Sequence, residues 1–251
     1  MRFWIAGTLL LSAGLARADH MHTVDHGDDG HAFGAGVTMI AASFDQPLYT
    51  GNYQGVVPAV QWANERFAAG TSVALYRLEE NGAEFYGFGD FVIHGQAMLI
   101  GNHHRHAGVV AAVSAPIGDD RRGMGMGHPM AMPALFGTWM VERFAVAATA
   151  GYSRALGADS GHDHGMWPIV EPMNMQEFTW SASGDYAFTP HVHGGARFSG
   201  GVPIGNGDNR IIGAARVAWG SGRFSTAAEL QAGIAGDPFT VRGVVSTAVS
   251  F

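Results

Sequence analysis

Alternation of apolar and polar residues is the feature that most constrains how this chain can fold. In the segment 240–251, Val241, Val245 and Phe251 share one face of an extended chain. Arg242 and Ser246 lie on the opposite face, because successive side chains of a strand point to opposite sides. This period of two recurs along the chain, whereas helical periodicity is almost absent. The sequence therefore predicts an all-β protein.

Twelve segments carry this alternation, and each is about ten residues or longer, enough for a tilted strand to cross a bilayer. Their apolar faces often end in an aromatic residue, as at Trp62, Trp139 and Trp219. Aromatic residues at strand ends are typical of the interfacial girdles of a membrane barrel. The predicted strands are 33–42, 53–63, 66–77, 85–99, 106–115, 131–141, 143–154, 176–188, 191–202, 211–220, 223–234 and 240–251.

The connections between these segments alternate in length. The long ones are 43–52, 78–84, 116–130, 155–175, 203–210 and 235–239; the short ones are 64–65, 101–105, 142, 189–190 and 221–222. Outer-membrane barrels have short periplasmic turns and long outer loops. We therefore predict one antiparallel transmembrane β-barrel of about 12 strands over residues 32–251, with both termini in the periplasm. The alternative is a soluble periplasmic all-β protein, which has no reason to alternate its connections in this way.

The first residues predict export. Arg2 is followed by an apolar run over 3–15 and by small residues at Ala16 and Ala18, which fits a signal peptide over 1–18. The alternative, an N-terminal membrane anchor, is disfavoured because the run is short for a span. A His- and Asp-rich segment, 19–31, follows. There is no cysteine, which excludes disulfides and cysteine–zinc sites, and the net charge of −7 disfavours a nucleic-acid partner.

Three Gly-rich motifs resemble those of one known family. EFYGFGDFVIHGQAML (84–99) resembles the G-x-G-D strand of a family of outer-membrane proteins linked with the meta-pathway of phenol degradation. VVAAVSAPIGD (109–119) is similar to the strand ending in Pro-x-Gly-Asp that follows it there, and GGVPIGNGDNR (200–210) to a later strand end. The terminal Phe251 is similar to the aromatic residue by which barrel-assembly machinery recognises its clients. The resemblance implies a barrel in outer-membrane lipid and suggests passage of solutes.

Histidine and methionine gather mostly outside the predicted strands. An H-x-H pair on an extended chain puts both imidazoles on one face, where they can chelate zinc or copper, and thioethers suit Cu(I). Met173 and Met175 lie in the same outer loop as His162 and His164, and two such loops could form one copper-collecting surface. Solvated histidine tracts and methionine used as packing filler are the ordinary alternatives. The candidate ligands are His20, His22, His26, His31, His103, His104, His106, His191 and His193 on the periplasmic side, and Met124, Met126, His128, Met130, Met132, His162, His164 and Met166 in outer loops.

A second set of candidate residues is predicted to face the barrel interior. Both charge signs occur, so these residues can line a polar passage or pair across the lumen and close it. They are Asp90, His94, Gln96, Asp185, Arg197, Arg216, Glu229, Gln231 and Arg242.

The sequence favours a transport-like barrel that handles copper or zinc ions and requires no cofactor. One alternative is a barrel for small apolar or aromatic solutes with incidental histidine-rich loops. The other is a non-conducting barrel that binds metal or a partner at its surface. An enzyme is disfavoured, since G-x-S-x-G, H-E-x-x-H and phosphate-binding loops are all lacking in the sequence.

Overall fold

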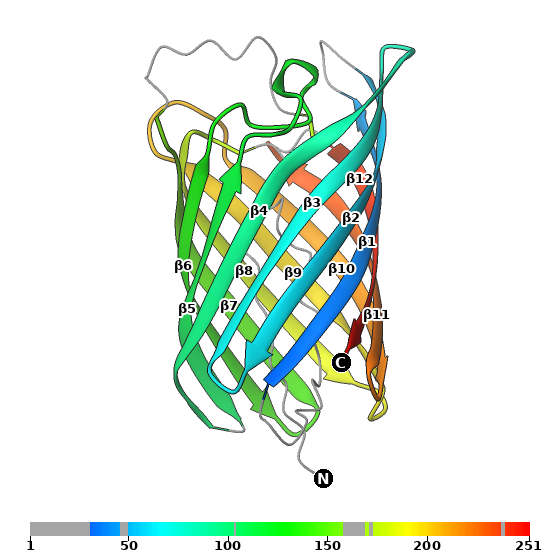
Figure 1. Cartoon of the computed structure of the whole chain (residues 1–251). Helices are drawn as coiled ribbons and strands as arrows, with labels where there is room; N and C mark the ends of the chain where they lie inside the picture. Colours follow the sequence, from blue (N-terminus) through cyan, green and yellow to red (C-terminus); the bar gives the residue numbers. More distant parts are fainter. Residues whose placement is uncertain (1–30, 46–49, 103, 158–168, 171–172, 237–238) are drawn as a thin grey trace.

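The computed structural model describes residues 31–45, 50–102, 104–157, 169–170, 173–236 and 239–251. In this part of the chain, twelve strands form one closed antiparallel barrel (Figure 1). They are β1 (His31–Asp45), β2 (Thr50–Asn64), β3 (Phe67–Glu80), β4 (Ala83–Asn102), β5 (Arg105–Ala115), β6 (Met130–Val141), β7 (Phe144–Ala155), β8 (Gln176–Ala187), β9 (Val192–Pro203), β10 (Arg210–Ser221), β11 (Phe224–Ala235) and β12 (Phe239–Ser250). The predicted fold class is confirmed.

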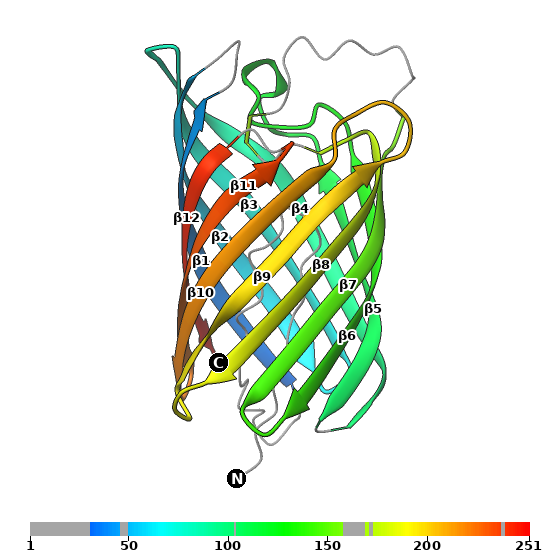
Figure 2. The same ribbon diagram turned by 180° about the vertical axis from the view of Figure 1, so that it is seen from behind.

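Each strand pairs with its neighbours in sequence, and β1 closes the barrel by pairing with β12, from Gly34↔Ser250 to Phe44↔Phe239 with one register shift after Ser43. The view from behind shows the same unbroken wall (Figure 2). Closure satisfies the hydrogen bonds of both edge strands, which a sheet in lipid requires. The predicted signal peptide, 1–18, lies outside the described residues, as does the predicted segment 19–31 except for His31, which begins β1.

The outer surface of the barrel carries large apolar side chains. Phe33, Leu135 and Leu230 are each more than 60% exposed, and Trp139 and Trp219 are about half exposed. An apolar surface of this kind is stable against hydrocarbon chains and unfavourable against water. Among the described residues, no helix has the length and apolarity to span a membrane.

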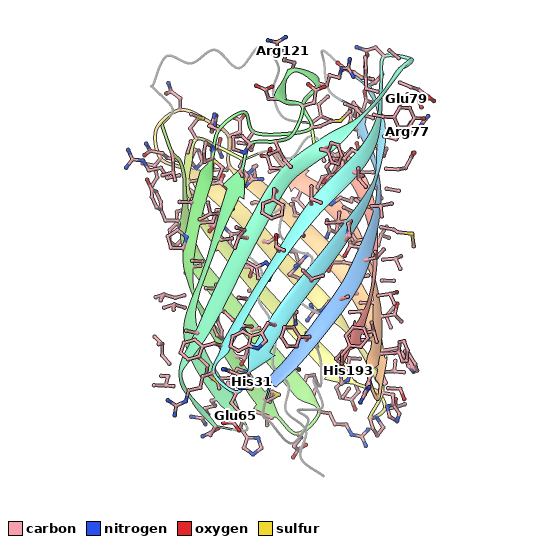
Figure 3. The ribbon with its side chains drawn as sticks, in the orientation of Figure 1. His31, Glu65, Arg77, Glu79, Arg121 and His193 are labelled. Carbon is pink, nitrogen blue, oxygen red and sulfur yellow. The ribbon has the colours of Figure 1, made fainter. Side chains whose placement is uncertain are left out.

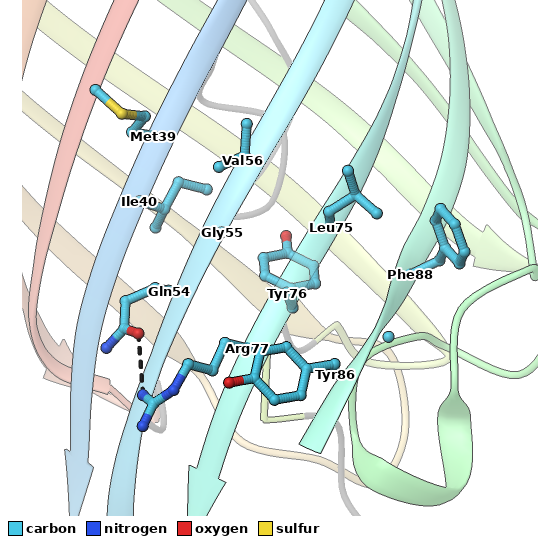
Figure 4. Close-up of a pocket in the computed structure, with 11 residues that line it drawn as sticks. Met39, Ile40, Gln54, Gly55, Val56, Leu75, Tyr76, Arg77, Tyr86 and Phe88 are labelled. Carbon is cyan, nitrogen blue, oxygen red and sulfur yellow. Dashed lines mark hydrogen bonds between the residues drawn. The ribbon is translucent and has the colours of Figure 1, made fainter. Parts of the chain in front are cut away.

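The outer wall changes from apolar to polar near the end that carries the long connections, here called the loop end; the opposite end is the turn end. A shallow hollow across β1–β4 marks the border (Figure 4). Gln54, Arg77 and Tyr86 form its polar row, and Arg77 Nη1 donates to Gln54 Oε1 at 3.0 Å. Arg77 also pairs with Glu84, so its charge is balanced. Figure 3 shows Arg77, Glu79 and Arg121 at the loop end, and His31 and Glu65 at the turn end. The apolar row of the hollow is Val56, Leu75 and Phe88.

One predicted long connection is wrong. Residues 78–84 are not a loop, because β3 runs to Glu80, β4 begins at Ala83, and only Asn81 and Gly82 join them. Both have positive φ, 49° and 83°, as a two-residue type I′ hairpin requires. The predicted strands ended at Arg77 and resumed at Phe85, although Asn-Gly between two strands is a strong signal for a two-residue hairpin turn.

A β-bulge in β4 changes which residues face the interior. Val73 pairs with Phe91 and Leu75 with Phe88, so Gly89 and Asp90 together oppose one residue of β3. An extra residue in one strand shifts its inward and outward alternation. The bulge therefore lets Asp90 face inward while Phe88 stays exposed on the outer wall.

Candidate functional site: the barrel interior

The interior of the barrel has two chemically different walls. Strands β1–β3 contribute an apolar wall with buried Ile40, Tyr53, Val57, Tyr76 and Leu78. Strands β5 and β6 extend it with a second buried cluster that contains Val110, Ala112 and Phe136. Strands β8–β12 carry most of the inward charges, and these form three arginine–carboxylate pairs.

Each arginine–carboxylate pair on the charged wall joins two strands that are separated by one intervening strand. Arg216 of β10 binds Asp185 of β8 through both carboxylate oxygens, with Nε–Oδ1 at 2.8 Å. Gly195 of β9 lies between them, and a Cβ there would overlap the Asp185 carboxylate. The glycine thus provides the space for the pair.

The other two pairs repeat this arrangement. Arg210 of β10 binds Glu177 of β8 at 2.5 Å, and Gly201 of β9 lies under the Glu177 carboxylate. Arg197 of β9 binds Glu229 of β11 at 2.5 Å across β10, where the register partner of Arg197 is Ala214. Small residues on the intervening strand therefore let long side chains cross it. Charge-assisted bonds of this kind are stronger than neutral ones, especially where water is excluded.

The charged wall is linked to the apolar wall through one chain of hydrogen bonds. Gln231 donates to Glu229, and Arg242 donates from Nε to the Gln231 carbonyl oxygen. Arg242 Nη1 then donates to the Tyr53 hydroxyl at 3.4 Å, and its guanidinium lies 4.2 Å from the ring centroid of Phe239. The chain runs from β11 through β12 to β2, which stiffens the wall where β1 and β12 close the barrel.

Replacing Gly195 by alanine is expected to destabilise the barrel by about 1–3 kcal/mol, the usual cost of overpacking. The added Cβ would overlap the Gly184 carbonyl oxygen and the carboxylate that binds Arg216. Stability is measured by the heat-induced gel shift, in which the folded barrel migrates faster than the unfolded chain. We expect the midpoint temperature of this shift to fall. Gly184→Ala is the matched control, because its Cβ meets nothing within 4 Å. Equal effects of the two substitutions would contradict the role of Gly195.

The carboxylate of Asp90 fixes a loop at the loop end of the barrel. It accepts the Gly118 N–H at 3.1 Å on one oxygen and the Met126 N–H at 3.0 Å on the other. Gly118 and Gly125 touch each other beside this carboxylate, and a Cβ on either would meet Asp90 within 2.9 Å. We call residues 118–126 the mouth segment.

The mouth segment is also held by packing. Met124 is 2% exposed and packs in the apolar cluster of β1–β3, whereas Met126 belongs to the cluster of β5 and β6. The Gly123 carbonyl accepts the N–H groups of Ile169 and Val170, both at 3.0 Å. Two connections of the loop end thus meet over the interior.

These contacts give the G-x-G-D and Pro-x-Gly-Asp motifs a physical meaning. Gly87 leaves room for the Met124 sulfur, and Gly89 for the ring of Tyr76. Asp90 then holds Gly118 of the second motif, and the Asp119 N–H donates to the Phe88 carbonyl at 3.2 Å. The two motifs are complementary halves of one contact.

The structure places the predicted lumen residues as follows. His94, Arg197, Glu229, Gln231 and Arg242 are buried inside the barrel. Asp185 and Arg216 are partly buried and paired with each other. Asp90 is engaged with the mouth segment, and Gln96 is partly buried with its Oε1 atom shielded from solvent.

Three interior residues were missed by sequence reasoning. Glu177 shares its strand face with Asp185, and Arg210 shares its face with Arg216, so the alternation could have found both. Arg210 was assigned to a loop, because the predicted strand began one residue later. Tyr53 carries no sequence signal for its contact with Arg242, since they are far apart in the chain.

The structure does not gather the described histidines. The His31 ring stacks on the Trp62 ring, with the two ring centroids 5.6 Å apart, and His104 lies in an exposed turn. At 191–193, His191 Nδ1 lies 2.9 Å from the Gly220 carbonyl oxygen, just before β9 begins at Val192, and chelation of a metal ion by this H-x-H pair stays a prediction. Within the described ranges, no group of three or more His, Asp or Glu is placed to hold a metal ion. The candidates His20, His22, His26, His103, His162, His164 and Met166 lie outside the described residues; His106 and His193 are half-buried in strands.

The candidate methionines are placed differently from the prediction. They were expected on an outer surface, but Met124, Met126, Met130 and Met132 are all less than 9% exposed, as is His128. The inward alternation of β6 and the descent of the mouth segment bury them.

The fold and its interior define a barrel of the outer-membrane type, and known structures agree with this class. A crystal structure of an outer membrane channel from Pseudomonas putida F1 superposes with a TM-score of 0.65, at 11% identity, over 92% of this chain and 100% of that one. The translocator domain of the autotransporter NalP from Neisseria meningitidis gives 0.58, at 13% identity, over 91% and 90%. The KdgM porin in complex with disordered oligogalacturonate gives 0.56, at 11% identity, over 87% and 99%. No protein-family model and no curated protein matches the sequence. At these identities the likeness shows the fold, and the family resemblance stays a prediction.

Proposed function

We propose that this protein is an outer-membrane channel for small organic solutes that combine an apolar body with a charged group. The observation that carries the proposal is the two-sided interior. Tyr53, Val57 and Tyr76 offer apolar and aromatic surface, while Arg216 and Asp185 offer fixed charges on the opposite wall. Binding sites for organic molecules are mostly apolar with a few placed polar groups.

The likeness to outer membrane channels supports a transport role and an outer-membrane location. Export by a cleaved signal peptide and recognition of Phe251 by assembly machinery belong to the same proposal. Phe251 follows β12 at the turn end, where its N–H donates to the Phe33 carbonyl at 2.8 Å and its ring is 67% exposed. An exposed terminal aromatic is available to another protein during assembly.

Passage is tested with the full-length mature protein in proteoliposomes and planar bilayers. We expect faster efflux of preloaded benzenesulfonate, which has an aromatic body and a permanent charge, than of glucose. If benzenesulfonate leaves no faster than from protein-free liposomes and no current steps appear, the channel proposal fails. The non-conducting surface barrel would then be the better interpretation.

Handling of copper or zinc by the histidine-rich segments remains a prediction. Its main difficulty is that His31, His104 and His191 each lie in a different local environment of the described structure. The organic-solute channel needs no contribution from them.

A further inference from the structure

Four methionine residues from three segments belong to one buried apolar cluster, which also contains Val110, Ala112, Ala134, Phe136 and Ala155. Met126 comes from the mouth segment, Met130 and Met132 from β6, and Met173 from the connection before β8. They are 8%, 0%, 2% and 9% exposed. We call these four residues the methionine cluster.

We propose that the methionine cluster binds a soft monovalent cation of the Cu(I) type. Thioether sulfur is a neutral, polarisable ligand that suits Cu(I), and it is a poor ligand for Ca²⁺ or Mg²⁺. A divalent ion would bring two charges into a mostly apolar environment, which is costly without several carboxylates. The chemistry of the cluster therefore selects both the softness and the single charge of the ion.

The surrounding structure fixes the ligands in place. Met130 and Met132 are two residues apart on β6, so both side chains point inward, and the Met130 N–H donates to Ser114 Oγ at 3.2 Å. The Met126 N–H donates to the Asp90 carboxylate at 3.0 Å, which holds the backbone of the third ligand in place. Ligands whose backbone is held before binding lose less entropy when they bind.

Packing alone is the competing explanation, since methionine fills irregular gaps in apolar cores. Leucine would serve packing nearly as well, because Leu and Met have similar volumes and exchange at low cost. Leucine cannot bind a metal ion, so Met→Leu substitution separates the two explanations. The proposal does not depend on passage through the barrel.

The test uses the refolded full-length mature barrel and Ag(I), an air-stable soft monovalent probe, in a competition titration. All proteins carry serine at His20, His22 and His26, which removes the terminal histidine tract as a ligand. The test variant is Met126→Leu/Met132→Leu/Met173→Leu. The matched control is Met39→Leu, because Met39 is 54% exposed on the outer wall and outside the cluster.

We expect one Ag(I) per barrel in the parent and the control, with a sulfur shell in X-ray absorption. The triple variant should bind at least tenfold more weakly while keeping its heat-shifted gel mobility, since ligand loss exceeds the roughly 10–100-fold effect of losing a supporting contact. Equal affinity of the triple variant and the parent would overturn the proposal. So would a parent that binds no Ag(I), or one whose bound Ag(I) shows no sulfur neighbours.

Discussion

Asp90→Asn is expected to raise the fraction of time that the barrel spends in its high-conductance state about tenfold or more. The Asp90 carboxylate accepts two backbone N–H groups of the mouth segment, and hydrogen bonds to charged groups contribute about 1.5–3 kcal/mol each. Asparagine has one acceptor oxygen, and its NH₂ group would face the second N–H. Since about 1.4 kcal/mol is a tenfold change in an equilibrium, the loss of one bond is enough.

Single-channel recording in planar bilayers measures this change, and trypsin cleavage after Arg121 and Arg122 gives a second readout of mouth-segment release. Asp119→Asn is the matched control, since it also removes one carboxylate charge at the loop end, from the mouth segment itself. Asp119 pairs with the exposed Arg122 at 3.5 Å, and exposed pairs contribute little. If both variants change conductance equally, or if neither changes it, Asp90 does not hold the mouth segment in the low-conductance state.

The alternation of period two was sufficient to predict most of the barrel. It gave the strand number and the inward placement of Arg197, Glu229 and Arg242, because one face of each strand must be apolar in lipid. Alternation reports only which side of the wall a residue faces. It says nothing about which inward side chains meet, and so the crossing of Arg216 to Asp185 over Gly195 was not predictable.

The sequence analysis placed Asp90 on the inward face correctly, but it did not predict the bulge beside it or the contacts that Asp90 makes. The bulge at Gly89 and Asp90 breaks the period within one strand, and its effect depends on the register with β3. The contact of Asp90 with Gly118 and Met126 joins residues that are distant in sequence. Methionines in a predicted loop were read as exposed, although the mouth segment descends into the barrel and buries Met124. Contacts between residues so distant in sequence depend on the three-dimensional fold, and the alternation pattern does not predict them.

Glu229→Gln is expected to destabilise the barrel by about 3–5 kcal/mol, the usual cost of removing one partner of a buried pair. Glu229 accepts from Arg197 at 2.5 Å and from Gln231, and the side chains of the Arg197–Glu229 pair are 5% and 4% exposed. After the substitution, the Arg197 charge stays in the interior without its carboxylate. The midpoint of the heat-induced gel shift measures the loss. Glu79→Gln is the control, because Glu79 pairs with Arg77 at the loop end and its side chain is 36% exposed.

A double variant distinguishes two effects of Glu229→Gln: an Arg197 charge left without its carboxylate, and a change in side-chain packing. Arg197→Met/Glu229→Gln removes both charges of this pair at once. It should recover much of the stability lost in Glu229→Gln, because the Arg197 guanidinium is no longer buried without its carboxylate. If the double variant is no more stable than Glu229→Gln, the pair acts through shape alone. In that case the hydrogen-bond chain through Gln231 and Arg242 to Tyr53 would be the structure that Glu229 supports.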